Sequence, residues 1–383
     1  MIRRVTAVAA VSIVLAGGLA GCGWGSPADP ASRGSRSSAA KAPDADFPAR
    51  DALVSVVCTP SSSGGGTVQV DGWDPKSWKH LARVQFPLPA ATAIRFEDAS
   101  DGSGLTTLCD LEPDDPDEVS AVDVAAIRSL FDQDFTKIAV TTLDRETQAT
   151  HVGYVDRTGK FTDLTGDEGF GNTPHEHTAS LSRDGQTLWF LRTNKTGTSL
   201  VSRSLSGDHR PVERLRTDGD NEQHVITAGK APGVVVLARS AALSPDGKHL
   251  IADGRFLDVP ADASVIDADK TGEPHRRACE EEPLLWATNE TVLCGSTTGS
   301  SPITTAGTAP KSTPGPSLLP DNDHNNQPMV VAPDGRSFVF LSINGSLSHY
   351  YVSATTPGST PRMADETGEF ATLGKQAFII DWR

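Results

Sequence analysis

The chain has 383 residues, of which 49 are Asp or Glu and 34 are Lys or Arg, so its formal net charge at pH 7 is −15. An acidic surface disfavours nucleic acid and anionic lipid headgroups, and neither is expected as a partner. The 35 glycines and 26 prolines argue against long helices and favour a chain rich in turns.

The N-terminus has the pattern of an export signal. Arg3 and Arg4 precede an apolar stretch over residues 5–20, which is short for a membrane-spanning helix and rich in Gly and Ala. The stretch ends in Leu19-Ala20-Gly21-Cys22, which resembles a bacterial lipobox. The resemblance implies a lipoprotein signal peptide over residues 1–21, with cleavage before Cys22 and lipidation of its thiol. An ordinary secretory signal with a chance cysteine is the alternative.

Residues 22–46 follow as a predicted disordered tether. They are rich in Ser, Ala, Pro and Gly and contain almost no large apolar side chains, so they cannot bury enough surface to offset the entropy of ordering. We therefore expect a lipid-anchored protein on the extracytoplasmic side of the cell membrane, with its folded domain over residues 47–383.

Four cysteines remain beyond Cys22, namely Cys58, Cys109, Cys279 and Cys294. An even number in an exported chain suggests two disulfides, and four cysteines allow three pairings. Proximity in sequence favours Cys279–Cys294 and hence Cys58–Cys109. Zinc binding and buried free thiols are the alternatives, although the chain has no Cys-x-x-Cys pair.

Three segments of the chain are copies of one another: LSRDGQTLWFL, LSPDGKHLIAD and VAPDGRSFVFL, centred on Asp184, Asp246 and Asp334. Asp-Gly favours a tight turn, because Asp accepts local backbone hydrogen bonds and Gly adopts positive φ. Each copy therefore predicts strand, turn, strand. The strands after the turn are apolar at successive positions, so both faces are expected to be buried.

These copies resemble the WD40-like repeats of TolB-type β-propellers, and Ser244-Pro245-Asp246-Gly247 matches that signature in full. Degenerate copies lie around Asp134, where Phe135 replaces Gly, and around Asn289, and a last hairpin is expected near Gly374. The intervals of about 40–60 residues suit four-stranded blades. The resemblance thus implies an all-β fold, a propeller of six to eight blades with seven favoured. Residues 51–58 and 103–112 are expected to supply strands of the first blades, and residues 296–320 a long loop.

The repeat type implies that the strand before each Asp-Gly is innermost, so the loop entering it opens on the mouth of a central channel. Three such loops are unusually polar, and blade closure would bring them onto one rim. Carboxylates and imidazoles there suit a divalent cation or a polar ligand, whereas solvated turns are the alternative. The candidate rim residues are His175, Glu176, His177, Asp220, Glu222, His224, Asp323 and His324.

No G-x-S-x-G, P-loop, G-x-G-x-x-G or H-E-x-x-H motif is present. The sequence therefore favours a lipid-anchored cell-envelope propeller that acts as a protein or ligand binding module over an enzyme. An envelope protein or a glycan is the expected partner, and no cofactor is expected unless the rim holds a divalent cation. The alternative is a propeller-type enzyme, similar to a lactonase or lyase, with a central metal site.

Overall fold

The computed structural model describes residues 47–383, apart from residues 49, 96–103, 111–120, 166–174, 218–222, 231–232, 269–278, 297–298, 310–311, 346, 365–367 and 374–376. All described residues belong to the compact unit Ala42–Arg383. The predicted signal peptide, Cys22 and the tether lie outside the described residues. No helix of the described part is long and apolar enough to cross a membrane.

The described strands form seven sheets, numbered here in chain order. Sheet 1 has the order β24 (Phe378–Trp382), β1 (Leu53–Pro60), β2 (Gly66–Trp73) and β3 (His80–Leu88). Sheet 2 contains β4 (Lys137–Leu143), β5 (Thr150–Asp156) and β6 (Phe161–Asp163). Sheet 3 contains β7 (His175–Leu181), β8 (Thr187–Asn194), β9 (Gly197–Ser204) and β10 (Val212–Thr217).

Sheets 5 to 7 are likewise antiparallel throughout, and sheet 4 contains one parallel pair. Sheet 4 has the order β11 (His224–Ala228), β12 (Val234–Ala238) and β16 (Val265–Asp267), and sheet 5 contains β13 (Ala241–Leu243), β14 (His249–Ala252) and β15 (Arg255–Asp258). Sheet 6 contains β17 (Glu282–Trp286), β18 (Thr291–Gly295) and β19 (Thr304–Gly307). Sheet 7 contains β20 (Asn325–Val331), β21 (Ser337–Asn344), β22 (Leu347–Ala354) and β23 (Arg362–Met363). Strands β12 and β16 pair in parallel, because β16 returns to sheet 4 after sheet 5 is complete.

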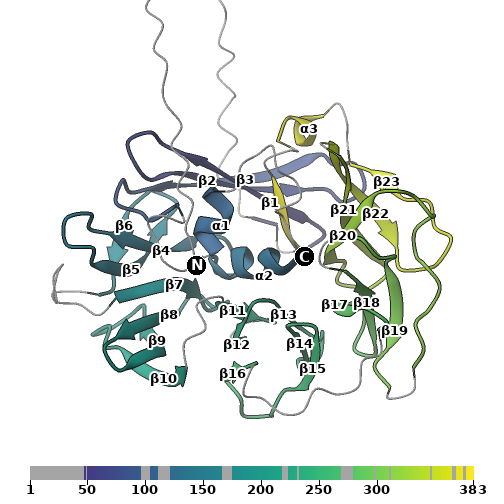
Figure 1. Cartoon of the computed structure of the whole chain (residues 1–383). Coiled ribbons are helices and arrows are strands. Elements are labelled where there is room, and N and C mark those ends of the chain that lie inside the picture. Colours follow the sequence, from purple (N-terminus) through teal and green to yellow (C-terminus); the bar gives the residue numbers. More distant parts are fainter. Residues whose placement is uncertain are drawn as a thin grey trace, which may run out of the picture. The chain divides into compact units, whose positions relative to one another are not determined.

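The sheets follow one another around a centre that holds α1 (Gly104–Asp110) and α2 (Ala121–Ser129), as Figure 1 shows. Six sheets turn one edge strand toward this centre: β24, β7, β11, β13, β17 and β20, called the inner strands below. Helix α2 packs against β11, β13, β20 and β24. Ser129 fixes it to sheet 4, because its Oγ accepts a hydrogen bond from the backbone N–H of Thr227 at 2.9 Å.

The three Asp-Gly copies form tight turns, as predicted. Gly185, Gly247 and Gly335 have φ values of +63°, +74° and +70°, a region that L side chains rarely adopt. In the second copy the Ser244 hydroxyl donates to the Asp246 carboxylate at 2.8 Å and accepts the N–H of His249 at 3.0 Å. The strand after the turn is buried on both faces in β8 and β21, which confirms that expectation.

The degenerate copy before sheet 2 keeps the turn although it lacks the glycine. Phe135 stands at the glycine position with φ +51°, and its ring is fully buried between Phe47 and Phe131 at centroid distances of 4.8 and 5.4 Å. A bulky residue in this region is strained, so burial of the ring offsets the backbone cost.

Three predictions about local structure are wrong. Residues 103–112 were expected to supply a strand, but Gly104–Asp110 is α1, and Leu105, Leu108 and Cys109 are buried at the spacing of one helix face. The expected hairpin near Gly374 is instead α3 (Glu369–Leu373) followed by β24, which pairs with β1; Gly374 itself lies outside the described residues. The segment 296–320 is not all loop, because it contains β19, which pairs with the preceding strand β18.

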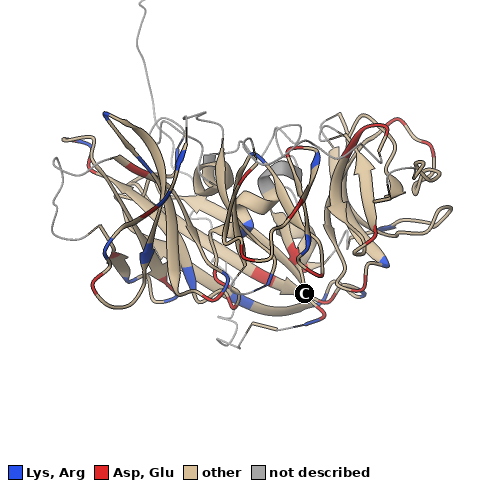
Figure 2. Ribbon diagram, turned by 90° about the horizontal axis from the view of Figure 1, so that it is seen from below, with Lys and Arg blue, Asp and Glu red and all other residues tan. Residues whose placement is uncertain are grey.

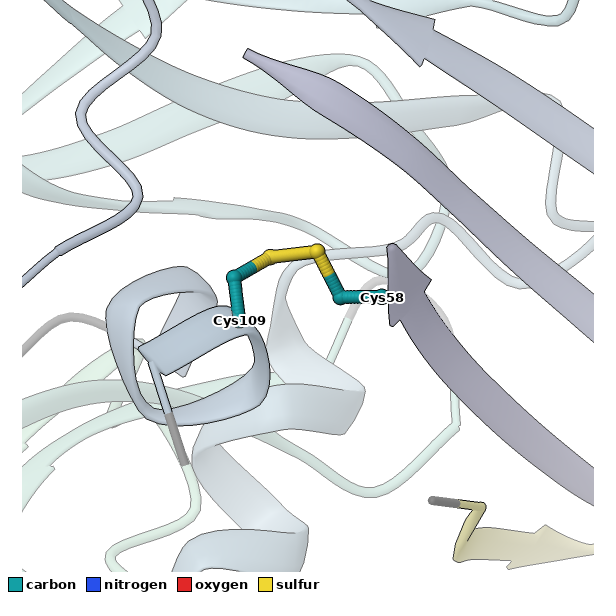
Figure 3. Close-up of a disulfide and its surroundings, with 2 residues drawn as sticks. All are labelled: Cys58 and Cys109. Carbon is teal, nitrogen blue, oxygen red and sulfur yellow. A yellow bond between two sulfur atoms is a disulfide. The ribbon is translucent and has the colours of Figure 1, made fainter. Parts of the chain in front are cut away.

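Two disulfides connect the four cysteines in the favoured pairing, Cys58–Cys109 and Cys279–Cys294. Figure 3 shows the first of them, which joins the end of β1 to α1. The second joins the segment before β17 to β18. The first bridge therefore fixes the central helix α1 to sheet 1, and the second staples sheet 6.

Candidate ligand cavity at the ends of the inner strands

A cavity of about 810 Å³ lies where the inner strands end. Its wall is formed mainly by α2 residues, by β13 and by the C-terminal parts of β11, β17, β20 and β24, together with neighbouring turns. Pockets that bind small ligands have volumes of about 300–1,000 Å³. The cavity is therefore large enough for a small molecule or for a few residues of a peptide.

The repeat turns contribute equivalent positions to this wall. The residue directly before the conserved Asp lines the cavity in all three clear copies, as Arg183, Pro245 and Pro333. Gln133 holds the same position in the degenerate copy and also lines the cavity. The repeat thus presents one side chain per turn to a shared space, and only the first copy presents an arginine.

Basic side chains outnumber acidic ones in the wall. The basic residues are Arg50, Arg128, Arg183, Lys230 and Arg383, and the acidic residues are Asp51 and Asp381. Elsewhere on the unit, basic and acidic residues are interspersed along the ribbon, as Figure 2 shows. The cavity is therefore a local concentration of positive charge in a chain whose net charge is −15, and it attracts anions.

Asp381 on β24 is the acidic centre of an arginine cluster. Its Oδ2 accepts from Arg128 Nε at 2.8 Å and lies 3.6 Å from Arg383 Nε. Burial alone would raise the pKa of the Asp381 carboxyl, but the charges of Arg128, Arg183 and Arg383 outweigh burial and hold that pKa below its usual value. Asp381 is therefore ionised at neutral pH and offsets one of the three positive charges around it.

Two of the three arginines have further acceptors. Arg128 Nη1 donates to the backbone carbonyls of Phe131 and Asp132 at 3.2 and 3.3 Å. Arg383 donates to the carbonyls of Pro48 and Gln133. Both guanidinium groups also lie over the Phe135 ring, with distances to its centroid of 4.5 and 5.1 Å. Their positions are thus fixed by the protein itself.

Arg183 differs from both. Its Nε and Nη1 atoms are buried, and neither has a hydrogen-bond partner in the structure. Burial lowers the pKa of the Arg183 guanidinium well below its ordinary value, and the charge of Arg128 lowers it further, whereas Asp381 opposes the shift. A buried cation with free donors is costly to fold, and such perturbed groups in clefts are typical of functional sites.

The rest of the wall is largely apolar. Helix α2 contributes Val124 and Ala125, and the inner strands contribute Ile226, Leu285, Val330 and Ile380. Trp286 and Trp382 add two aromatic surfaces. A cavity with apolar walls and a few convergent polar groups is the usual composition of a ligand site.

The rim residues predicted from sequence lie at the opposite ends of the same inner strands. His175 begins β7, His224 begins β11, and Asp323 and His324 directly precede β20. A strand of seven residues such as β7 is about 20 Å long, so His175 is remote from the turn that holds Arg183. His224 begins the shorter β11 and lies two residues before Ile226, which lines the cavity. Asp220 and Glu222 lie outside the described residues.

Glu176 is not a rim residue, although the sequence suggested it. It is fully buried, and its carboxylate accepts hydrogen bonds from Arg192 at 2.9 Å and Arg203 at 2.6 Å, and from the Thr165 hydroxyl at 2.7 Å. Its role is to balance two guanidinium charges inside sheet 3. It alternates with its strand neighbours, so it points away from the exposed His175.

Two of the remaining described rim residues, His177 and His324, have local hydrogen-bond partners. His177 contacts the hydroxyls of Thr178 and Thr193 at 3.0 and 3.1 Å, and His324 contacts the Ser342 hydroxyl at 2.9 Å. Within the residues that the structure describes, no group of three or more His, Cys, Asp or Glu side chains is placed to hold a metal ion. A divalent cation at the rim stays a prediction that involves the undescribed loops.

Comparisons with known proteins do not assign a family. No family model matches the sequence, and no curated protein matches it. Similar solved structures include TolB from Acinetobacter baumannii, with 13% identity over 83% of this chain and 81% of that protein, at a TM-score of 0.33. A Bacteroides uniformis protein provisionally assigned as a 6-phosphogluconolactonase has 14% identity over 82% of each chain, at a TM-score of 0.34.

A third similar structure is prolyl oligopeptidase B from Galerina marginata, with 11% identity over 81% of this chain and a TM-score of 0.38. This chain spans only 44% of that protein. The TM-scores and identities of these three structures are low, so they carry no conclusion about activity.

Proposed function

We propose that this chain is a seven-bladed β-propeller that binds a ligand in its central cavity. The seven sheets are its blades, and β24 closes the ring by completing the sheet of β1. The hydrogen-bonded pair β1–β24 supports this closure, because it joins the first described strand to the last. Such closure protects sheet edges and gathers the inner strands around one axis.

The observation that carries the binding function is the cavity itself. It combines a volume of about 810 Å³, apolar walls and arginines fixed by the protein around one space. Stability alone does not explain the free donors of Arg183, because they cost free energy in the ligand-free protein. An envelope protein or a glycan stays the partner class that the sequence predicts. No described group of residues specifically favours the alternative, a lactonase-like or lyase-like enzyme with a central metal.

Anchoring by a lipid on Cys22 is the second part of the proposal. It rests on the lipobox-like segment that ends at Cys22. Cys22→Ala should move the protein from the membrane fraction to the soluble fraction or leave an uncleaved precursor, whereas Ser26→Ala in the tether should change neither. A Cys22→Ala protein of mature size that still requires detergent for extraction would contradict the anchor.

The binding function is tested with a neutral probe, so that the charge of the cavity is not part of the test. Nile red fluorescence is titrated with the full chain carrying Cys22→Ala, in detergent-free buffer. Adding Ala241→Trp fills space in the cavity wall, and the matched control Ala261→Trp lies on an exposed loop. We expect saturable binding that Ala241→Trp abolishes and Ala261→Trp preserves. Equal binding by all three proteins would contradict the proposal.

A further inference from the structure

We infer that the cavity selects ligands with one anionic group on an apolar body, and that Arg183 binds the anionic group. This inference rests on the proposed binding function and specifies its ligand class. The anion is a carboxylate or a phosphate, since both accept the charge-assisted hydrogen bonds that a guanidinium donates. The apolar body lies against the wall formed by α2 and the inner strands.

The hydrogen-bond inventory of the cluster assigns this role to Arg183. Arg128 and Arg383 are held by Asp381 and by backbone carbonyls. Arg183 is the member of the cluster whose buried Nε and Nη1 have no acceptor. An anion in the cavity would supply the missing acceptor without displacing any contact that the protein already makes.

The charges point the same way. Arg128, Arg183 and Arg383 surround the carboxylate of Asp381, and the charges of Asp132 and Asp134 also act on Arg383. Among the residues that line the cavity, basic side chains are in excess over acidic ones. Arg50 and Lys230, both exposed members of the cavity wall, add positive charge toward solvent. This arrangement draws an anion in from solvent and leaves its final hydrogen bonds to the buried guanidinium.

The apolar wall sets the other half of the specificity. Val124, Ile226, Met329 and Ile380 line the same cavity as Arg183, and Trp286 and Trp382 can pack against a flat or branched group. A small inorganic anion would satisfy Arg183 but would leave most of about 810 Å³ unfilled. A ligand with an apolar part gains burial in addition to the ion contact.

The test compares three probes of equal chain length by calorimetry: hexanoate, hexyl phosphate and the neutral hexanamide. The protein is the full chain carrying Cys22→Ala, with and without Arg183→Met. We expect an anionic probe to bind about tenfold or more tightly than hexanamide, because it forms charge-assisted hydrogen bonds. Arg183→Met should remove that preference. Arg210→Met, which removes an exposed arginine, should retain it.

The outcomes separate the two proposals. A preference for hexanoate identifies a carboxylate ligand, and a preference for hexyl phosphate identifies a phosphate ligand; both support the inference. Equal affinity for hexanamide and the anions in the wild-type chain overturns it, as does a preference that survives Arg183→Met. If Nile red binds and the anions show no preference, only this inference fails. If no probe binds, including Nile red, the proposed function fails too. Arg183→Gln repeats the test if the methionine variant melts early.

Discussion

Replacing Arg183 with methionine should stabilise the ligand-free protein. Methionine keeps the length of the arginine stem and removes a guanidinium whose buried Nε and Nη1 have no acceptor. It also removes the repulsion that Arg128 and Arg383 exert on this group. Replacing a whole buried ion pair by apolar side chains of similar volume is often neutral or stabilising by about 1–4 kcal/mol, because it removes the cost of desolvating the charges. Asp381 and partial solvent access offset some of the cost, so we expect about 2 kcal/mol.

The expected change in melting temperature follows from the size of the folded unit. Globular proteins gain about 2.1 cal/mol/K of entropy per residue on unfolding, or about 0.7 kcal/mol/K for about 340 residues. A stabilisation of about 2 kcal/mol therefore raises the midpoint by about 3 °C. Differential scanning calorimetry at pH 7 without ligand measures this shift directly.

Arg128→Met is the matched control, because it makes the same substitution in the same cavity with the opposite expected sign. Arg128 donates to Asp381 and to two backbone carbonyls, so its removal leaves these acceptors without their donor. Breaking a buried pair in this way costs about 3–5 kcal/mol, or about 4–7 °C by the same conversion. If Arg183→Met lowered the melting temperature as Arg128→Met does, Arg183 would be structural and the argument for a free donor would be wrong.

Three further predictions concern the fold and the charge clusters. Gly335→Ala should destabilise the fold by about 2–5 kcal/mol, since φ is +70° and a Cβ would lie 2.0 Å from the backbone carbonyl oxygen of Ala287. Gly358 has a φ of +77° but open space around it, so Gly358→Ala should cost about 1–2 kcal/mol. Equal melting shifts for the two variants would refute the close approach at Gly335. Glu176→Gln should cost about 3–5 kcal/mol in urea unfolding, because two guanidinium groups lose their counter-charge; an unchanged midpoint would contradict a structural role. The pKa of Asp381 is lower in the folded protein than in the unfolded chain, where it is about 3.9, so ionised Asp381 stabilises the fold above that pH and this stabilisation is lost as the pH falls through the folded pKa. Asp381→Asn should therefore be less stable than the wild type at pH 7 and should lose less stability between pH 5 and pH 2. Parallel pH profiles of the two proteins would exclude a contribution of Asp381 to stability.

Structural features that depend only on residues adjacent in the sequence were predictable. The Asp-Gly turns formed because Asp and Gly dictate the local backbone, and the positive φ of Gly247 follows from that alone. The same local reasoning predicted a long loop over residues 296–320, the segment that contains Gly299. The structure gives Gly299 a φ of +73°, and a Cβ there would lie 2.7 Å from the backbone nitrogen of Asn326. A segment of simple composition therefore still has packing constraints set by a neighbouring strand.

The central helices show where local reasoning failed. α1 has seven residues, too few for a convincing periodic pattern, although Leu105, Leu108 and Cys109 have helical spacing. Its position is fixed by the disulfide to Cys58, which is far away in sequence. The pairing of β24 with β1 is equally non-local, because it joins the two ends of the described chain. Tertiary contacts of this kind cannot be predicted from a short stretch of consecutive residues.

The candidate rim was predicted from clusters of His and acidic residues. Its described members lie at or just before the starts of inner strands, whereas the cavity lies toward the ends of these strands. The cavity combines side chains from α2, five inner strands and several turns, so composition at any one place could not reveal it. One local signal existed. Arg183 stands where the other two clear copies have proline, at Pro245 and Pro333. A departure of this kind at one position of a repeat indicates a candidate functional residue.

This departure also explains how an acidic protein can carry a basic site. Net charge describes the surface as a whole, whereas the field inside a cavity is set by the few charges around it and by low-dielectric walls. The repeat supplies a rigid turn in each copy and leaves the residue before Asp free to vary, since the turn is specified by Asp and Gly and not by that residue. An arginine at this position in one turn is enough to introduce a guanidinium into the shared space without altering the sheet that holds it. The side chain at one position of the repeat can therefore change to suit a ligand, while the other positions of the repeat maintain the fold.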